Sequence, residues 1–166
     1  MGKKKNLTQV DFDFGIASII PSTQEAFKKE FKGNIRKSES ANLAVFKEKL
    51  IGDLTIRLKG SMQFPSRSEV FVFIMQYFVS PKEYGSRDID NMAKTILDVI
   101  KGRFYLDDSQ VKTLLVGKKL DKRVPENFAY VALKELRSDR DVDALKISGL
   151  ERSVTLFQEL KSQGIL

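Results

Sequence analysis

Two pairs of aspartates frame a short helical pattern in the middle of the chain. Asp88 and Asp90 come just before the pattern, and Asp107 and Asp108 come just after it. Lys94 lies four residues beyond Asp90, so it falls on the same helical face as that carboxylate. Carboxylates that gather in one place repel each other unless a cation lies between them, and oxygen-only ligands favour a hard cation such as Mg²⁺ or Mn²⁺. The pattern therefore indicates a metal centre.

The spacing of the two pairs allows them to meet. A helix over residues 91–101 is about 16 Å long at about 1.5 Å per residue. Residues 102–108 reach up to about 23 Å when they are extended. The chain can therefore turn and bring Asp108 back beside Asp90. We expect Asp88, Asp90 and Asp108 to converge at the N-terminus of the helix.

Each acidic pair also has an ordinary structural interpretation. Asp is a common N-cap and stabilises a helix by about 1 kcal/mol, which accounts for Asp88 or Asp90 but not for both. Asp107 and Asp108 suit a turn, and alone that interpretation would be preferred. Beside the first pair we favour Asp108 as a ligand and leave Asp107 open. Lys94 could also form a helix pair with Asp90 that is worth only a few tenths of a kcal/mol.

Composition limits the remaining chemistry. The chain has 166 residues, with no cysteine and no histidine. Disulfides, thiolate zinc sites, imidazole ligands and Ser-His triads are therefore excluded. A content of 42% hydrophobic and 31% charged residues suits one globular core. We find no signal peptide and no apolar run long enough to span a membrane, and we expect a cytoplasmic protein.

The net charge of +7 is distributed unevenly. Residues 1–60 carry 12 Lys+Arg against 7 Asp+Glu, and residues 101–137 carry 9 against 5. Residues 61–100 between them carry 4 against 5. A polyanionic partner would be drawn to the basic flanks and would meet a cation at the centre. The alternative is a basic surface that serves solubility alone.

A basic turn could contact the phosphates of a polyanionic partner, although such contacts are unspecific. It lies between the last two predicted strands and contains Lys118, Lys119, Lys122 and Arg123. Such a turn is more commonly only a solvated connection. The composition of the turn does not separate the two interpretations.

Hydrophobic periodicity predicts an α+β fold, a mixed β-sheet with helices packed on it in the order β-α-β-α-β-β. The expected strands cover residues 10–20, 70–79, 110–116 and 127–136, and the expected helices cover residues 38–59, 91–101 and 149–163. The strand over 70–79 should be central, since it is apolar along nearly its whole length. Ser38 or Ser40 can cap the first helix. Residues 23–32 fit a short helix or a loop, and residues 82–86 fit a loop. The last helix is a C-terminal amphipathic helix.

The central stretch resembles the RusA family of Holliday-junction resolvases. That family carries an Arg-Asp-x-Asp-Asn-x-x-Lys segment, then a helix, then an aromatic-x-x-Asp-Asp-x-Gln-Val-like segment. Two linked motifs at a fitting separation are far more specific than a lone Asp-x-Asp. In this chain they read Arg87-Asp88-Ile89-Asp90-Asn91-Met92-Ala93-Lys94 and Tyr105-Leu106-Asp107-Asp108-Ser109-Gln110-Val111.

The resemblance implies an activity and roles for the residues of both motifs. Asp88, Asp90 and Asp108 would bind Mg²⁺ and act in catalysis together with Lys94. The family is homodimeric and cuts four-way DNA junctions by paired nicks in recombination and repair. A member would be associated with the nucleoid when it acts. The nucleic-acid contacts would include Arg87, Asn91 and the basic turn, although Asn91 equally suits the first turn of a helix.

Two other functions remain open at this point. One is a non-catalytic protein that binds branched DNA through the same basic surface. The other is a plain dimerisation module with a stray acidic turn. We expect residues 1–137 to form the nuclease domain and residues 138–166 a helical extension.

Overall fold

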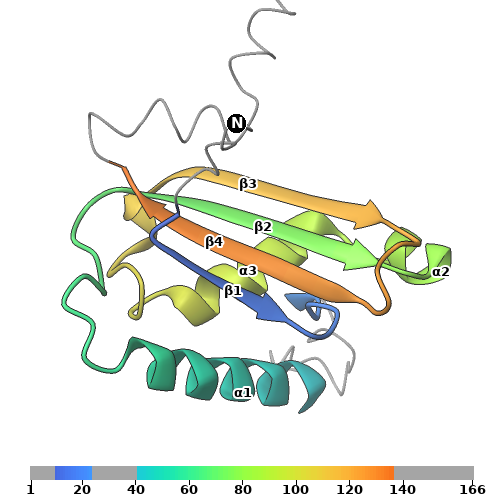
Figure 1. Cartoon of the computed structure of the whole chain (residues 1–166), viewed down its shortest axis with the longest axis horizontal. Coiled ribbons are helices and arrows are strands. Elements are labelled where there is room, and N and C mark those ends of the chain that lie inside the picture. The colour runs from blue at the N-terminus through green and yellow to red at the C-terminus, as the bar shows by residue number, and fades with distance from the viewer. Residues whose placement is uncertain (1–9, 24–40, 137–166) are drawn as a thin grey trace, which may run out of the picture.

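The computed structural model in Figure 1 describes residues 10–23 and 41–136. Its four strands are β1 (Phe12–Ile16), β2 (Val70–Phe78), β3 (Val111–Leu120) and β4 (Phe128–Glu135). Its helices are α1 (Ala41–Leu58), α2 (Pro81–Gly85), α3 (Ile89–Ile100) and the 3₁₀ turn η2 (Asp108–Gln110). The strands form one sheet in the order β1-β4-β2-β3. The predicted α+β fold with a mixed sheet is confirmed.

β2 lies inside the sheet, as its apolar sequence predicts. It pairs antiparallel with β4 and parallel with β3. Two parallel neighbours need a crossover, and here α2, α3 and η2 provide it. The chain therefore leaves β2 at one end of the sheet, returns along α3, and enters β3 at the other end. Both acidic pairs lie on this crossover, one at each of its turns.

α3 forms because its apolar side chains recur at helical spacing. The predicted face is buried under the sheet, with exposed fractions of 1% for Met92 and 0% for Ile96, Val99 and Ile100. The helix begins at Ile89 and not at residue 91. It is followed by a turn at Gly102, whose φ of 76° is costly for any other residue.

α1 packs on the same face of the sheet as α3 (Figure 1). Leu43, Leu50 and Leu54 of its predicted stripe are buried, and Phe46 and Leu58 pack against the core. The helix is described from Ala41 onward, so the predicted caps at residues 38 and 40 lie outside the described residues. The first strand is shorter than residues 10–20.

The loop expected at residues 82–86 is wrong, because the chain forms the short helix α2 there. Pro81 occupies its first turn, where a fixed φ and a missing N–H are tolerated. The Tyr84 N–H donates to the Ser80 carbonyl at 3.0 Å. The helix places the chain at the start of α3.

The extent of the third strand is also corrected. β3 runs to Leu120, because its pairing with β2 continues to the Phe78–Leu120 pair. Lys118 and Lys119 therefore belong to a strand and not to a turn, whereas Lys122 and Arg123 do lie in a turn. Here tertiary pairing overrides the polar local sequence.

The remaining predictions on secondary structure fall elsewhere in the chain. The helix expected over 149–163, with the extension 138–166, and nearly all of residues 23–32 lie outside the described residues. The division into two domains stays a prediction. No helix within residues 10–23 and 41–136 is long and apolar enough to cross a membrane.

Candidate active site

The N-terminus of α3 carries the first acidic pair. Asp88 occupies the N-cap position, but its side chain makes no capping hydrogen bond. Asp90 follows in the first turn, and both residues are exposed. Within the described part of the chain, neither carboxylate forms a hydrogen bond or an ion pair. The capping interpretation therefore explains the position of Asp88 but not the use of its carboxylate.

Lys94 is exposed one turn further along α3. No ion pair within 4 Å joins it to Asp90, or to any other carboxylate among the described residues. The structure therefore does not support the alternative interpretation, in which Lys94 forms a helix pair with Asp90. Its ammonium group stays available to a ligand near the start of the helix.

Asn91 lies beneath the acidic pair and is only 8% exposed. Its Oδ1 accepts a hydrogen bond from the Thr23 hydroxyl at 3.0 Å. The buried Nδ2 has no hydrogen-bond partner among the residues described. The Thr95 hydroxyl donates to the Pro21 carbonyl at 2.8 Å. Asn91 therefore ties the segment after β1 to the first turn of α3. Thr23 is a contributor that the sequence patterns did not indicate.

Lys118 joins the end of β3 to the segment that leads into α3. Its Nζ donates to the carbonyl of Tyr84 at 2.8 Å and to that of Arg87 at 2.7 Å. The same Nζ lies 4.6 Å from the centre of the Tyr84 ring. Lys118 therefore holds the backbone directly before Asp88, a role that its sequence context did not suggest.

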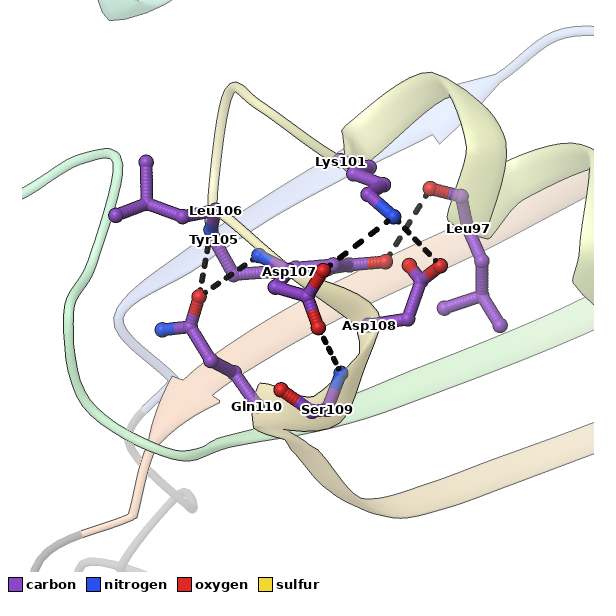
Figure 2. A network of polar contacts seen from close by, with 8 residues as sticks. All are labelled: Leu97, Lys101, Tyr105, Leu106, Asp107, Asp108, Ser109 and Gln110. Carbon is purple, nitrogen blue, oxygen red and sulfur yellow. Dashed lines mark hydrogen bonds and ion pairs between the residues drawn. The ribbon is translucent and has the colours of Figure 1, made fainter.

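The second acidic pair lies beyond the C-terminus of α3 and is engaged with neighbours (Figure 2). Lys101 Nζ is 2.8 Å from Asp108 Oδ2 and 3.8 Å from Asp107 Oδ2. The hydrogen bond to Asp108 raises the pKa of Lys101. The sequence gives one signal for this contact, a basic residue at the end of a helix.

Asp107 serves the turn η2. Its Oδ1 accepts from the Ser109 N–H at 2.9 Å, and this bond is the main reason that the pKa of Asp107 is lowered. Gln110 Oε1 accepts from the Leu106 and Asp107 N–H groups at 2.7 and 2.9 Å. The turn interpretation thus describes Asp107, which the sequence left open.

Gln110 also fixes this end of the crossover to the rest of the fold. Its Nε2 donates to the carbonyls of Ser66 and Ser68 at 3.0 and 2.9 Å. The Tyr105 hydroxyl donates to the Leu97 carbonyl at 3.2 Å (Figure 2). Burial raises the pKa of Tyr105, so this donor keeps its proton. The segment carrying Asp107 and Asp108 is therefore held on both sides.

The two acidic pairs do not come together in one chain. Arg87 lies against Lys118, which pairs with Gln76 near the end of β2, whereas Asp108 precedes Val111, which pairs with Val70 at its start. A strand rises about 3.3 Å per residue, so roughly 20 Å separates the two ends. No group of three acidic side chains close enough for a metal ion is found among the described residues. The expected convergence of Asp108 with Asp88 and Asp90 is wrong for a single chain, because a parallel crossover enters β3 at the opposite end.

Basic side chains lie at the same end of the sheet as Asp88. Lys119 is 3.6 Å from Asp121, and Arg123 contacts the same carboxylate at 2.6 and 2.9 Å. These Arg123 N–H donors hold the pKa of Asp121 far below its usual range. Arg123 is nevertheless 82% exposed on its side chain, and Lys122 is exposed as well. The end of the sheet near Asp88 thus offers positive charge around two unpaired carboxylates.

Comparison with known families assigns this arrangement to a class. Residues 17–128 match the model of a family of endodeoxyribonucleases, hydrolases that cut DNA within its strands. No curated protein matches the chain. The matching family is endodeoxyribonuclease RusA, which acts on Holliday junctions, and the chain belongs to it. The match contains the whole crossover from β2 to β3.

Proposed function

We propose that this protein is a Mg²⁺-dependent endonuclease that resolves four-way DNA junctions by paired nicks. The observation that carries the proposal is the pair of exposed carboxylates on Asp88 and Asp90 at the start of α3, without partners among the described residues. Two adjacent negative charges left uncompensated are unfavourable unless a cation binds there. Both groups offer oxygen atoms alone, which fits Mg²⁺ or Mn²⁺.

Asp88 and Asp90 would hold the ion. Asp108 lies toward the opposite end of β2 in one chain, so it would be the further ligand that the family motif supplies only where a second chain brings it there. When bound, such an ion lowers the pKa of a coordinated water and counteracts the charge of a phosphate. Lys94 would stabilise the negative charge that develops on the scissile phosphate. Arg87 and the Lys118 that holds its carbonyl would keep the backbone before Asp88 in place.

DNA would approach the end of the sheet where β3 ends. Lys119, Lys122 and Arg123 are exposed there and would contact phosphates. Asn91 would orient the loop and not reach the DNA, since its side chain is buried. A homodimer would supply the two active sites that paired nicking in recombination and repair requires.

The competing function is a non-catalytic protein that binds junctions through the same basic surface. Asp88 and Asp90 argue against it, since unpaired carboxylates would only repel DNA. A nicking assay on one four-way junction and on a linear duplex of the same sequence, with and without Mg²⁺, tests the proposal. Mg²⁺-dependent nicks at the junction centre are expected. Junction binding in chelator without nicking in Mg²⁺ or Mn²⁺ would establish the competing function.

A further inference from the structure

One face of the sheet carries no helix among the described residues. α1 and α3 both pack on the other face (Figure 1). The core on that face takes alternate residues of the two central strands, among them Val72, Ile74, Val131 and Leu133. Successive residues of a strand point to opposite faces of a sheet. The intervening residues therefore form a second face, made by Phe71, Phe73, Met75, Tyr77, Tyr130, Ala132 and Lys134.

Three residues of this second face are nevertheless buried. The exposed fraction is 0% for Phe71, 2% for Ala132 and 1% for Lys134. Phe71 lies opposite Lys134, and Phe73 opposite Ala132, so the buried residues form one patch. A sheet face is closed to solvent only where another layer packs on it. The described helices lie on the other side, so a further segment of the chain has to supply this layer.

The burial is uneven along the second face. Phe71 and Lys134 are fully buried where β2 starts and β4 ends. Met75, Tyr77 and Tyr130, toward the opposite end of β2, are only partly buried. The covering segment therefore lies mainly over the start of β2 and the end of β4.

We propose that the C-terminal segment packs on the second face, with the amphipathic helix expected over residues 149–163 as the third layer of an α/β/α domain. This inference goes beyond the proposed nuclease function and does not depend on it. Residues 149–163 lie outside the described residues. Their sequence supplies a matching apolar stripe, made by Leu150, Val154, Phe157 and Leu160.

The length of the chain permits this arrangement. β4 ends at Glu135, beside the buried patch, so the segment that follows begins where the burial is complete. Residues 137–148 span up to about 40 Å when they are extended, which is enough to reverse direction over the sheet. A helix over residues 149–163 is about 22 Å long, and the nine residues of β2 extend over about 30 Å. The expected helix therefore fits within the sheet.

The other segments outside the described residues fit the second face less well. Residues 1–9 contain three lysines and no acidic residue, which suits a face that buries Lys134 poorly. Residues 138–166 carry 5 Asp+Glu against 4 Lys+Arg, and a buried ammonium group is stable only beside such acceptors. Residues 24–40 connect Thr23, which is hydrogen-bonded to the start of α3, with α1, so both their ends lie on the side of the helices.

Tryptophan fluorescence tests whether the apolar stripe is packed. The chain has no tryptophan, so one introduced indole reports on one position. Phe157→Trp places the probe on the stripe, and Thr155→Trp, the matched control, places it on the opposite side of the same helix. In the full-length protein, Phe157→Trp should emit at shorter wavelength and be quenched by acrylamide several-fold less than Thr155→Trp. Equal quenching of the two variants would overturn the proposal.

Paired cysteines identify the surface that the helix contacts. The chain has no cysteine of its own, so the pairs are unambiguous. Phe73→Cys on the second face is combined in turn with Val154→Cys, Phe157→Cys and Leu160→Cys. A short bifunctional maleimide is used, because facing Cα atoms of a helix and a sheet lie further apart than a disulfide spans. At least one pair should be crosslinked within a single chain.

Ile56→Cys combined with Phe157→Cys is the control for these pairs. Ile56 is 76% exposed and belongs to α1, on the other side of the sheet. This pair should stay uncrosslinked under the same conditions. Crosslinking to Ile56 as fast as to Phe73 would show that the segment has no fixed place. A crosslink of Phe73 only between chains would assign the layer to a second copy, and no crosslink of Phe73 would exclude the segment from this face. Each of these three results would overturn the proposal.

Stability and metal binding should respond differently to the loss of this layer. Phe157→Asp should lower the Tm by about 5 °C or more, since it exposes apolar surface of the sheet. Thr155→Asp should change the Tm little, and equal shifts in the two variants would overturn the proposal. Mg²⁺ affinity measured by calorimetry should match wild type in both variants, because Asp88 and Asp90 lie on α3 near the other end of β2.

The inference and the proposed function fail in different ways. A fall in Mg²⁺ affinity confined to Phe157→Asp would place the segment at the start of α3 and would overturn its packing on the second face. A wild-type protein that binds no Mg²⁺ and never nicks a junction would remove the proposed function. The quenching and the crosslinks would still decide whether the C-terminal helix forms the third layer.

Discussion

The two ends of α3 carry the same residue types in opposite states. At its start, Asp88 and Asp90 stand near Lys94 and are unpaired within the described structure. Past its end, Asp107 and Asp108 are bound by Lys101 and by the Ser109 N–H. A carboxylate with a partner stabilises the fold, whereas one without a partner is expected to bind something else. Within one chain we therefore expect ligand binding at the start of α3, whereas the partners of the carboxylates past its end indicate support of the fold.

The largest expected effect is at the start of the helix. Asp90→Asn should reduce Mg²⁺-dependent nicking by more than about 100-fold, since it removes a charged ligand. Junction binding in chelator should stay equal or tighten, because a repulsive charge is gone. Gel-shift titration beside the nicking assay measures both. Mg²⁺ should also raise the Tm of wild type more than that of the variant.

Asp98→Asn is the control for that variant. Asp98 lies on the same helix, is 47% exposed on its side chain, and is 3.4 Å from Lys47. Its replacement should leave nicking and Mg²⁺ affinity unchanged. Equal losses of nicking and Mg²⁺ affinity in Asp90→Asn and Asp98→Asn would show that any negative charge on α3 has this effect. The start of the helix would then not be a specific binding site.

The next largest effects concern Lys94 and Lys101, whose replacements should change different properties. Lys94→Ala should lower the nicking rate by about 100-fold, as expected for the loss of a charge that stabilises a transition state. Its Tm should change little, since Lys94 has no ion pair among the described residues. Lys101→Ala should leave DNA affinity unchanged but lower Mg²⁺ affinity if Asp108 is a ligand. Identical kinetics for both variants and wild type would leave Lys94 without a catalytic role.

Much of the fold follows from periodicity alone. The apolar run of β2 and the face made by Met92, Ile96 and Ile100 predict a central strand and a buried helix, because burial fixes which side chains must be apolar. The short helix α2 was missed, since five residues carry too little pattern. The length of β3 was missed because its pairing with β2, and not its own composition, sets its end.

The site was predicted less completely, for reasons of distance. Chain length shows that Asp108 could reach Asp90, but only the parallel order of β2 and β3 decides whether it does. Lys118 is 31 residues from the Arg87 carbonyl that it holds, so no local signal marks the contact. The candidate site residues were singled out because two motifs of a known family coincide in one stretch. Their roles in metal binding and catalysis stay predictions.

Variants of the lysines at the end of β3 should distinguish contacts with DNA from support of the fold. Lys119→Ala combined with Lys122→Ala should reduce the slope of log affinity against log salt by about one to two units, since two phosphate contacts disappear. Lys118→Ala should leave the slope nearly unchanged, because its Nζ is committed to two carbonyls. If Lys118→Ala reduces the slope and the double variant does not, then Lys118 contacts DNA and the exposed Lys119 and Lys122 do not.

Lys118→Ala should instead loosen the backbone before α3. Hydrogen bonds from a charged donor stabilise the fold by about 1.5–3 kcal/mol each when they are well formed. Because Lys118 is only half-buried, its replacement should lower the free energy of unfolding by less than this range implies. Hydrogen exchange should accelerate at the amides of residues 87–92 but not at those of β2. Uniform acceleration across the sheet would mean that Lys118 supports the whole fold and not this segment.

The smallest effect belongs to Asp107 at the far end of the helix. Its pKa is lowered from 3.8 by the Ser109 N–H and by Lys101, so its charge stabilises the folded state. A lowered pKa gives a contribution that is complete above about pH 3.8 and disappears as the pH falls through the folded-state value. Asp107→Ala should therefore lower the Tm slightly at pH 7, and the difference from wild type should shrink below pH 4. Asp107→Asn keeps an acceptor for Ser109 and should fall between the two proteins at pH 7. A Tm difference that stays constant from pH 7 to pH 3 would show that the Asp107 charge contributes nothing, and that its side chain stabilises the turn only as an uncharged acceptor for the Ser109 N–H.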